Sequence, residues 1–133
     1  MSRKKKKTRK YTPRNEFRYN NSKLAQGHPH YVFGETPTHY KSLGLTTHPK
    51  DDIPHYQLTK NPEPHNNDAS YLQFAVHSAN KKYYDEPLKG WKFAKKDMPV
   101  VRHTIKKYKK STNRKPKLWY VKKRQWNNKR NKK

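Results

Sequence analysis

The sequence predicts an α+β domain, in which a small antiparallel sheet of roughly three to five strands carries one C-terminal amphipathic helix. Proline and glycine separate short apolar or alternating stretches, which is typical of strands joined by turns. Leu72, Phe74 and Val76 recur with period two, as on one face of a strand. Val101, Ile105 and Tyr108 recur at i, i+4 and i+7, as on one face of a helix. The sheet is expected to be open or to curl into a half-barrel.

The strands are expected in four segments: His30–Phe33, Tyr40–Thr46, Ile53–Leu58 and Ser70–Val76. A hairpin connection at Gly34–Pro37 joins the first two. Residues 61–68 contain no apolar side chain except proline and are rich in turn formers, so they are expected to form a surface loop.

Aromatic and apolar side chains gather around Gly90 and are expected to cover one face of the sheet: Tyr83, Tyr84, Leu88, Trp91 and Phe93. The helix of about 13 residues is expected to start near Asp97, whose carboxylate can accept the first helical N–H groups. Pro99 is tolerated in a first turn. The other helix faces carry Arg102, Lys106, Lys107, Lys109 and Lys110, which form either a solvated lysine face or, as we favour, a phosphate-facing surface.

Length and composition indicate one small domain with extensions. The chain has 133 residues, of which 29% are apolar, against roughly 45–50% in ordinary globular domains. Part of the chain is therefore expected to stay unburied. We divide it into a basic flexible arm over residues 1–27, an α+β domain over residues 28–112 and a basic, aromatic arm over residues 113–133.

The positive charge is concentrated at the two ends. The net charge is +25, to which residues 1–23 contribute +9, residues 24–98 contribute +1 and residues 99–133 contribute +15. Blocks of like charge resist compaction and gain free energy when they contact phosphates. This distribution predicts a polyanionic partner, namely RNA or DNA.

Both arms are candidate binding segments. The first contains Arg3, Lys4, Lys5, Lys6, Lys7, Arg9 and Lys10, a run that in a eukaryote would equally serve as a nuclear import signal. The second interleaves Arg114, Lys115, Lys117, Lys122, Lys123 and Arg124 with Trp119, Tyr120 and Trp126. Alternating rings and cations suit single-stranded nucleic acid, because unpaired bases stack on the rings. The alternative is that Leu118, Trp119 and Val121 pack back on the core.

Several classes of function lack support. The chain has no cysteine, no apolar run long enough to span a membrane and no secretory signal after its basic start. No phosphate loop, dinucleotide fingerprint or nucleophile elbow is present, so no cofactor is expected. We expect a protein of the cytosol, bacterial in the first instance, with no membrane partner.

The eight histidines call for an explanation. A metal site would use His28 and His30, with Asp51 and Asp52 as oxygen ligands. However, the remaining histidines are scattered and no metalloprotease spacing occurs, so no metal site is predicted.

Metal-independent RNA cleavage is the enzymatic alternative. It needs a histidine to remove a proton, a cation to stabilise the developing phosphate charge and a group to protonate the leaving oxygen. Residues of these types lie on or beside the expected strands: Lys41, His48, His55, Lys60 and Tyr71. Each has an ordinary structural explanation as well.

Four segments, "HYKSLGLTTHP", "IPHYQLTKNPEP", "SYLQF" and "GWKFAKKDMPVVRHTIKKYKK", resemble small uncharacterised basic proteins encoded on mobile elements and phages of Gram-positive bacteria. The resemblance covers roughly residues 28–110 and implies a cytosolic bacterial setting. By analogy, such small basic β-rich proteins are similar to ribonuclease toxins of the RelE and barnase kind. The sequence therefore predicts a nucleic-acid-binding protein that favours RNA, with a ribonuclease toxin and a ribosome-associated or virion-packaging protein as alternatives.

Overall fold

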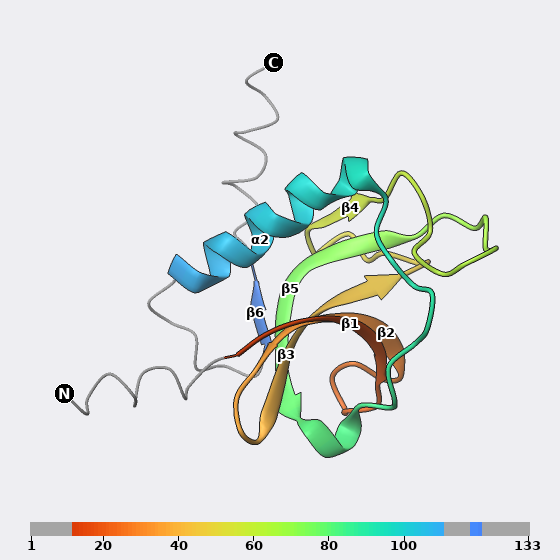
Figure 1. Cartoon of the computed structure of the whole chain (residues 1–133). Coiled ribbons are helices and arrows are strands. Elements are labelled where there is room, and N and C mark those ends of the chain that lie inside the picture. Colours follow the sequence, from red (N-terminus) through yellow and green to blue (C-terminus); the bar gives the residue numbers. More distant parts are fainter. Residues whose placement is uncertain (1–11, 111–117, 121–133) are drawn as a thin grey trace.

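A computed structural model describes residues 12–110 and the backbone of residues 118–120. Within these residues the fold is one antiparallel sheet with one α-helix laid across it (Figure 1). The strands are β1 (Thr12–Asn20), β2 (His28–Glu35), β3 (His39–Thr46), β4 (His55–Gln57), β5 (Tyr71–Asn80) and β6 (Leu118–Tyr120). Two short 3-10 helices, η1 (Lys81–Tyr83) and η2 (Lys95–Asp97), precede the helix α2 (Met98–Lys110). The α+β prediction is confirmed.

The strand order is β1-β2-β3-β5-β4, and β6 pairs with β5 beyond the end of β4. The four predicted strands correspond to β2 to β5, although β5 is longer and β4 shorter than expected. Residues 61–68 form no strand or helix, as predicted.

The boundary of the predicted N-terminal arm is corrected. β1 lies inside residues 1–27, yet it pairs with β2 from Thr12 opposite Glu35 to Asn20 opposite His28. Its alternation of Phe17 with Glu16 and Arg18 explains the pairing, since the apolar ring points to one side and the charges to the other. The folded domain therefore includes residue 12 onward. Likewise β6 lies within the segment assigned to the C-terminal arm.

The sheet is strongly curved, because the pairing shifts at three places. These shifts lie between Pro13 and Glu16 of β1, between Val32 and Gly34 of β2, and where β3 passes from Leu43 to Leu45 against β5. An extra residue in one strand bends it and increases its twist. Figure 1 shows the resulting curl of β1 and β2.

One side of the sheet, which we call the apolar face, holds the main core. Phe17, Tyr31, Leu43 and Val76 form one row across β1, β2, β3 and β5. Phe74 is fully buried beside them. Val101 and Tyr108 from α2 pack on this face, together with Leu58 and Phe93. The apolar side chains predicted on one face of β5 thus pack in the same core as those predicted on one face of the helix.

The start of α2 is tied to the β4 region by a buried carboxylate. Asp97 accepts hydrogen bonds from the Thr59 backbone N–H at 3.0 and 3.1 Å, from the Thr59 hydroxyl at 3.1 Å and from the Tyr56 hydroxyl at 3.1 Å. We expected Asp97 to accept the first N–H groups of the helix. Among the described residues, the hydrogen bonds that Asp97 accepts come from Thr59 and Tyr56 instead.

The opposite side, the polar face, carries the neighbouring row Glu16, Val32, Ser42 and His77. A smaller cluster of Val32, Tyr40 and Tyr84 is buried there. The aromatic segment was expected to cover a single face, but the chain divides it: Leu88, Trp91 and Phe93 pack on the apolar face and Tyr84 on the polar face, while Tyr83 is exposed. Between them, the backbone N–H groups of residues 85 and 88 bond to carbonyls of β1 and cover its edge.

Within the residues that the structure describes, no helix is long and apolar enough to cross a membrane.

Candidate functional site

The outer face of α2 is a cationic surface. Arg102, Lys106 and Lys109 are all exposed and follow one another at i, i+4 and i+7, so they project from the same side of the helix. They line a shallow groove of about 520 Å³ together with His103 and Ile105. The side chains that pack inward from α2, Val101, Thr104 and Tyr108, are buried, and this fixes the rotation of the helix.

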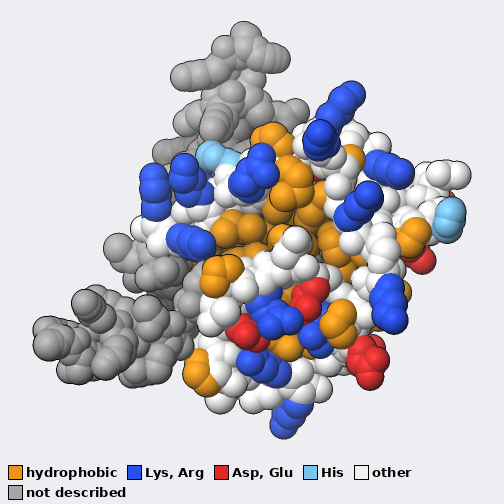
Figure 2. Space-filling model, in the orientation of Figure 1, with side chains coloured by type: hydrophobic (Ala, Val, Ile, Leu, Met, Phe, Trp, Pro, Cys, Tyr) orange, Lys and Arg blue, Asp and Glu red, His pale blue; other side chains and the backbone are white. Residues whose placement is uncertain are grey.

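The segment that carries this surface is poor in acidic residues. Residues 89–110 contain nine basic residues and one acidic residue, Asp97. Asp97 is fully buried, and the hydrogen bonds described above use its carboxylate. Figure 2 shows Lys and Arg side chains gathered over α2 and around an apolar area below it. A polyanion approaching this side meets a positive field.

Of the predicted binding residues, those on α2 are placed by the structure, and Lys107 is half-buried while the other four are exposed. Trp119 and Tyr120 lie in β6, opposite Val76 and Ala75. The remaining candidates lie outside the described residues: Arg3, Lys4, Lys5, Lys6, Lys7, Arg9, Lys10, Arg114, Lys115, Lys117, Lys122, Lys123, Arg124 and Trp126.

The predicted ribonuclease residues are spread over the sheet. Lys41 bonds to Ser78 at 3.1 Å near one end of β3, whereas His48 follows the other end and bonds to Thr47. Six residues separate them, and the strand from Lys41 to Thr46 alone spans about 17 Å.

His55 and Tyr71 do meet, with ring centres 5.7 Å apart. His55 Nδ1 also lies 2.8 Å from the Ile53 carbonyl oxygen. Within residues 12–110, no hydrogen bond or ion pair joins this pair to Lys41, His48 or Lys60. Two of the five residues therefore lie together. The cleavage mechanism requires a base, a cation and an acid around one point, and these five residues are not arranged in that way.

Sequence reasoning missed a hydrogen-bonded chain on the polar face. His30 Nδ1 lies 2.8 Å from the Ser42 hydroxyl, which lies 2.9 Å from the Tyr84 hydroxyl. Asn20 Nδ2 lies 3.5 Å from the same histidine nitrogen. Opposite His30 in the sheet stands Gly44, where a Cβ would come within 3.3 Å of His30 Nε2. The sequence pattern that could have indicated these hydrogen bonds is the alternation of Tyr40, Ser42 and Gly44 with Leu43 and Leu45.

Burial shifts the pKa values of residues in and beside this hydrogen-bonded chain. Desolvation, with the nearby His77 and His28, holds the pKa of His30 well below its ordinary value. Desolvation and His28 lower the pKa of His77 to about 4. Burial also raises the pKa of Tyr84 to about 12. Both histidines are therefore neutral at pH 7, and His30, which is 1% exposed, is out of reach of a substrate. Its role is structural.

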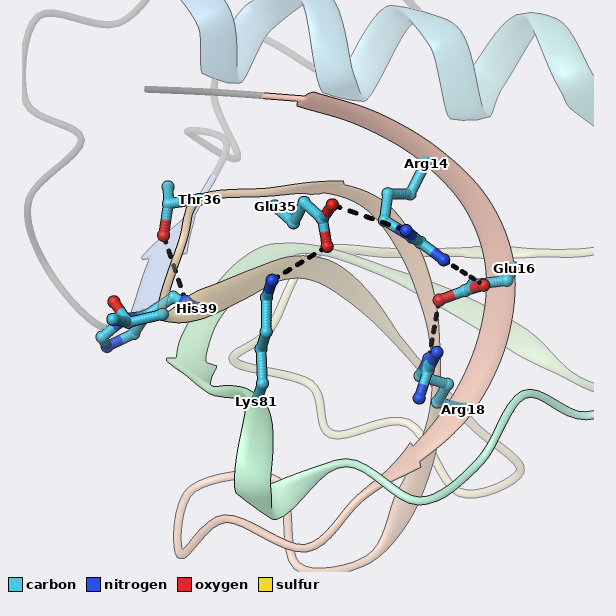
Figure 3. Close-up of polar contacts among 8 residues, drawn as sticks. Arg14, Glu16, Arg18, Glu35, Thr36, His39 and Lys81 are labelled. Carbon is cyan, nitrogen blue, oxygen red and sulfur yellow. Dashed lines mark hydrogen bonds and ion pairs between the residues drawn. The ribbon is translucent and has the colours of Figure 1, made fainter. Parts of the chain in front are cut away.

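An ion-pair network lies at the rim of the polar face (Figure 3). Its three cations, Arg14, Arg18 and Lys81, lie 6.0, 4.8 and 5.2 Å from the centre of the Tyr40 ring. Glu16 pairs with Arg14 at 2.9 Å and with Arg18 at 2.6 Å, and Glu35 pairs with Arg14 at 3.4 Å and with Lys81 at 3.1 Å. Burial alone would raise the pKa of Glu16, but the hydrogen bonds from the two arginines hold it below the ordinary value. A carboxylate held in this way is a weak base, so the network joins β1 and β2 to η1 and has no evident catalytic use.

Two ideas from the sequence remain, namely a metal site at His28 and His30 and the resemblance to mobile-element proteins. His28 is exposed and His30 buried, and no group of three histidine, aspartate or glutamate side chains among the described residues is arranged to hold a metal ion. Comparison of the chain with models of protein families, with curated proteins and with solved structures gives no match. The resemblance to mobile-element proteins stays a prediction.

Proposed function

We propose that this protein binds nucleic acid, RNA in preference to DNA, and that the exposed face of α2 is a principal contact surface for the phosphate backbone. The observation that carries the proposal is the excess of nine basic residues over one buried acid in residues 89–110. Cations on a rigid helix are positioned in advance, so less side-chain and backbone freedom is lost on binding.

The groove on α2 supports contact with a phosphate chain in particular. Arg102, Lys106 and Lys109 are spaced along about two turns, so that successive cations are about 5–6 Å apart along the helix axis, and neighbouring phosphates of a nucleic acid strand are separated by a comparable few ångströms. Ile105 adds an apolar floor. The preference for RNA is supported by the alternation of rings and cations in residues 114–126, which suits unpaired bases.

The test compares two double variants that remove the same charge from different surfaces. Arg102→Gln with Lys106→Gln alters the α2 groove, and Lys50→Gln with Lys60→Gln alters exposed lysines in the loops on either side of β4. Binding of a fluorescent single-stranded RNA is measured from low to moderate salt. Each phosphate contact contributes about 0.7 to the slope of log affinity against log salt on a single strand.

We expect the α2 variant to lower that slope by about 1.4 and the loop variant to leave it unchanged. A duplex DNA of equal length should bind more weakly than the RNA at each salt concentration. Equal slopes for the two variants would remove α2 from the interface, and absence of binding by the unaltered protein would refute the function itself.

A further inference from the structure

A second concave site lies away from the α2 groove, where four segments of the chain converge. It is a cavity of about 550 Å³, within the range of small-molecule sites. The β1–β2 connection contributes residues 22–24, β3 contributes His39, β5 contributes residues 77–80 and η1 contributes Tyr83. None of the functions considered above uses it.

The cavity collects exposed apolar surface. Leu24 is 54% exposed and Tyr83 40% exposed, and these are the exposed large hydrophobic side chains among the described residues. Both line this cavity. Single exposed apolar residues are common on protein surfaces, but two in one hollow indicate a site that a ligand covers.

Its charge is positive. Lys23 is part of the lining, and Lys82 Nζ lies 5.3 Å from the centre of the Tyr83 ring. No aspartate or glutamate is among the described residues that line the cavity. A ligand with a flat apolar surface and an attached anion therefore matches this side of the molecule better than a neutral or cationic one.

Polar groups also line the cavity. His77, which is 6% exposed, presents a neutral imidazole at pH 7 because burial keeps its pKa at about 4. Asn80 uses its side-chain oxygen to accept the Lys82 N–H at 3.0 Å. Its amide nitrogen makes no hydrogen bond within the described residues and can donate to a ligand. Imidazole and amide groups are suited to the edges of a nucleobase.

One lysine links the lining of the cavity to α2. Lys41 bonds to Ser78, which lines the cavity, and its Nζ lies 5.9 Å from the ring centre of Tyr108 in the last turn of α2. Lys41 thus contacts both a residue that lines the cavity and a residue of α2.

We propose that this cavity binds one unstacked nucleobase of a single-stranded RNA, with the base against Tyr83 and its phosphate near Lys82 and Lys23. The proposal rests on the function proposed above and adds to it a reason for preferring single strands. A base held in a duplex is stacked and paired, so it cannot enter. Contact of a base with an aromatic ring is worth about 1–3 kcal/mol, or roughly a fivefold to 150-fold change in affinity.

The experiment compares Tyr83→Ala with Tyr83→Phe on two probes, a ten-nucleotide oligouridylate and an RNA hairpin with a fully paired stem closed by a short loop. Tyr83 is exposed, and its side chain makes no hydrogen bond to the residues that the structure describes, so both variants should keep the unfolding midpoint of the unaltered protein. We expect Tyr83→Ala to weaken oligouridylate binding at least fivefold with an unchanged salt slope, and Tyr83→Phe to retain it. Hairpin binding should change less than twofold in both.

The outcomes separate this proposal from the first. If Tyr83→Ala binds oligouridylate as tightly as the unaltered protein while the α2 variant is weakened, the base site is refuted and the phosphate surface stands. If the unaltered protein binds neither probe, uridine 5′-monophosphate is titrated and the His77 and Tyr83 ring signals are followed by NMR. Saturable shifts there support the cavity, and their absence refutes it as well.

Discussion

The two faces of the sheet differ although their residues alternate along the same strands. The row Phe17, Tyr31, Leu43 and Val76 points to the apolar face, and the row one residue away, Glu16, Val32, Ser42 and His77, points to the polar face. The first row is buried by contact with other apolar side chains. The second is covered in part by Tyr84 and needs hydrogen bonds wherever a polar group is buried.

This difference explains why the candidate sites lie where they do. On the apolar face, α2 must turn its apolar stripe inward, and its cations are left on the outside. The cavity lies where the β1–β2 connection, the start of β3, the end of β5 and η1 meet. The same alternation thus leaves cations on the outer side of α2 and buried polar groups on the other face of the sheet.

The largest expected effect comes from breaking the apolar face. Phe74→Ala removes a fully buried ring from the middle of the core, and such truncations cost about 3–5 kcal/mol. The loss should be visible as a reduced urea midpoint. Tyr71→Ala serves as a control, because that ring is half-buried at the start of the same strand and should cost less. A smaller loss for Phe74→Ala than for the control would contradict the assigned core.

A second prediction distinguishes the polar face by its response to acid. His77 has a pKa of about 4 when folded and about 6.5 when unfolded, so below pH 6.5 the unfolded chain binds the additional proton. The free energy of unfolding therefore falls as the pH drops from about 6.5 toward 4, by up to about 3 kcal/mol from this residue. His30 acts in the same direction, since its pKa is also lowered.

Urea unfolding between pH 7 and pH 4 measures this dependence. His77→Gln, which stays uncharged, should flatten the decline, whereas His65→Gln should not, because His65 is exposed in the loop after β4. An equally steep decline in the His77 variant would show that other groups control the acid response.

The smallest effect is expected at the rim of the polar face. Glu16→Gln leaves Arg14 and Arg18 without their shared carboxylate, but these side chains are partly exposed to water. The cost should be about 1 kcal/mol and should shrink as salt is added. Thermal unfolding at low and high ionic strength checks this. A loss as large as that of Phe74→Ala would mean that the ion pairs are as central to stability as the core.

Local patterns were sufficient for much of the fold. The alternation in Leu72, Phe74 and Val76 and the helical spacing of Val101, Ile105 and Tyr108 predicted the elements that form the core. Exposure of Arg102 and Lys106 followed from the same spacing. β1 was missed because charges alternate with its few apolar residues and resemble the basic run that precedes it in sequence.

What the sequence by itself determined is therefore the distribution of charge and the faces of its strands and helix, since both depend on residues close together in the chain. Which histidines become buried, which aromatic residues of the 83–93 segment cross to the other face, and where a cavity opens were decided by tertiary structure. His30, Ser42, His77 and Tyr84 meet through strand register and through bulges that shift it. Register depends on pairing between segments up to tens of residues apart, and a single extra residue in a strand changes which side chains face each other.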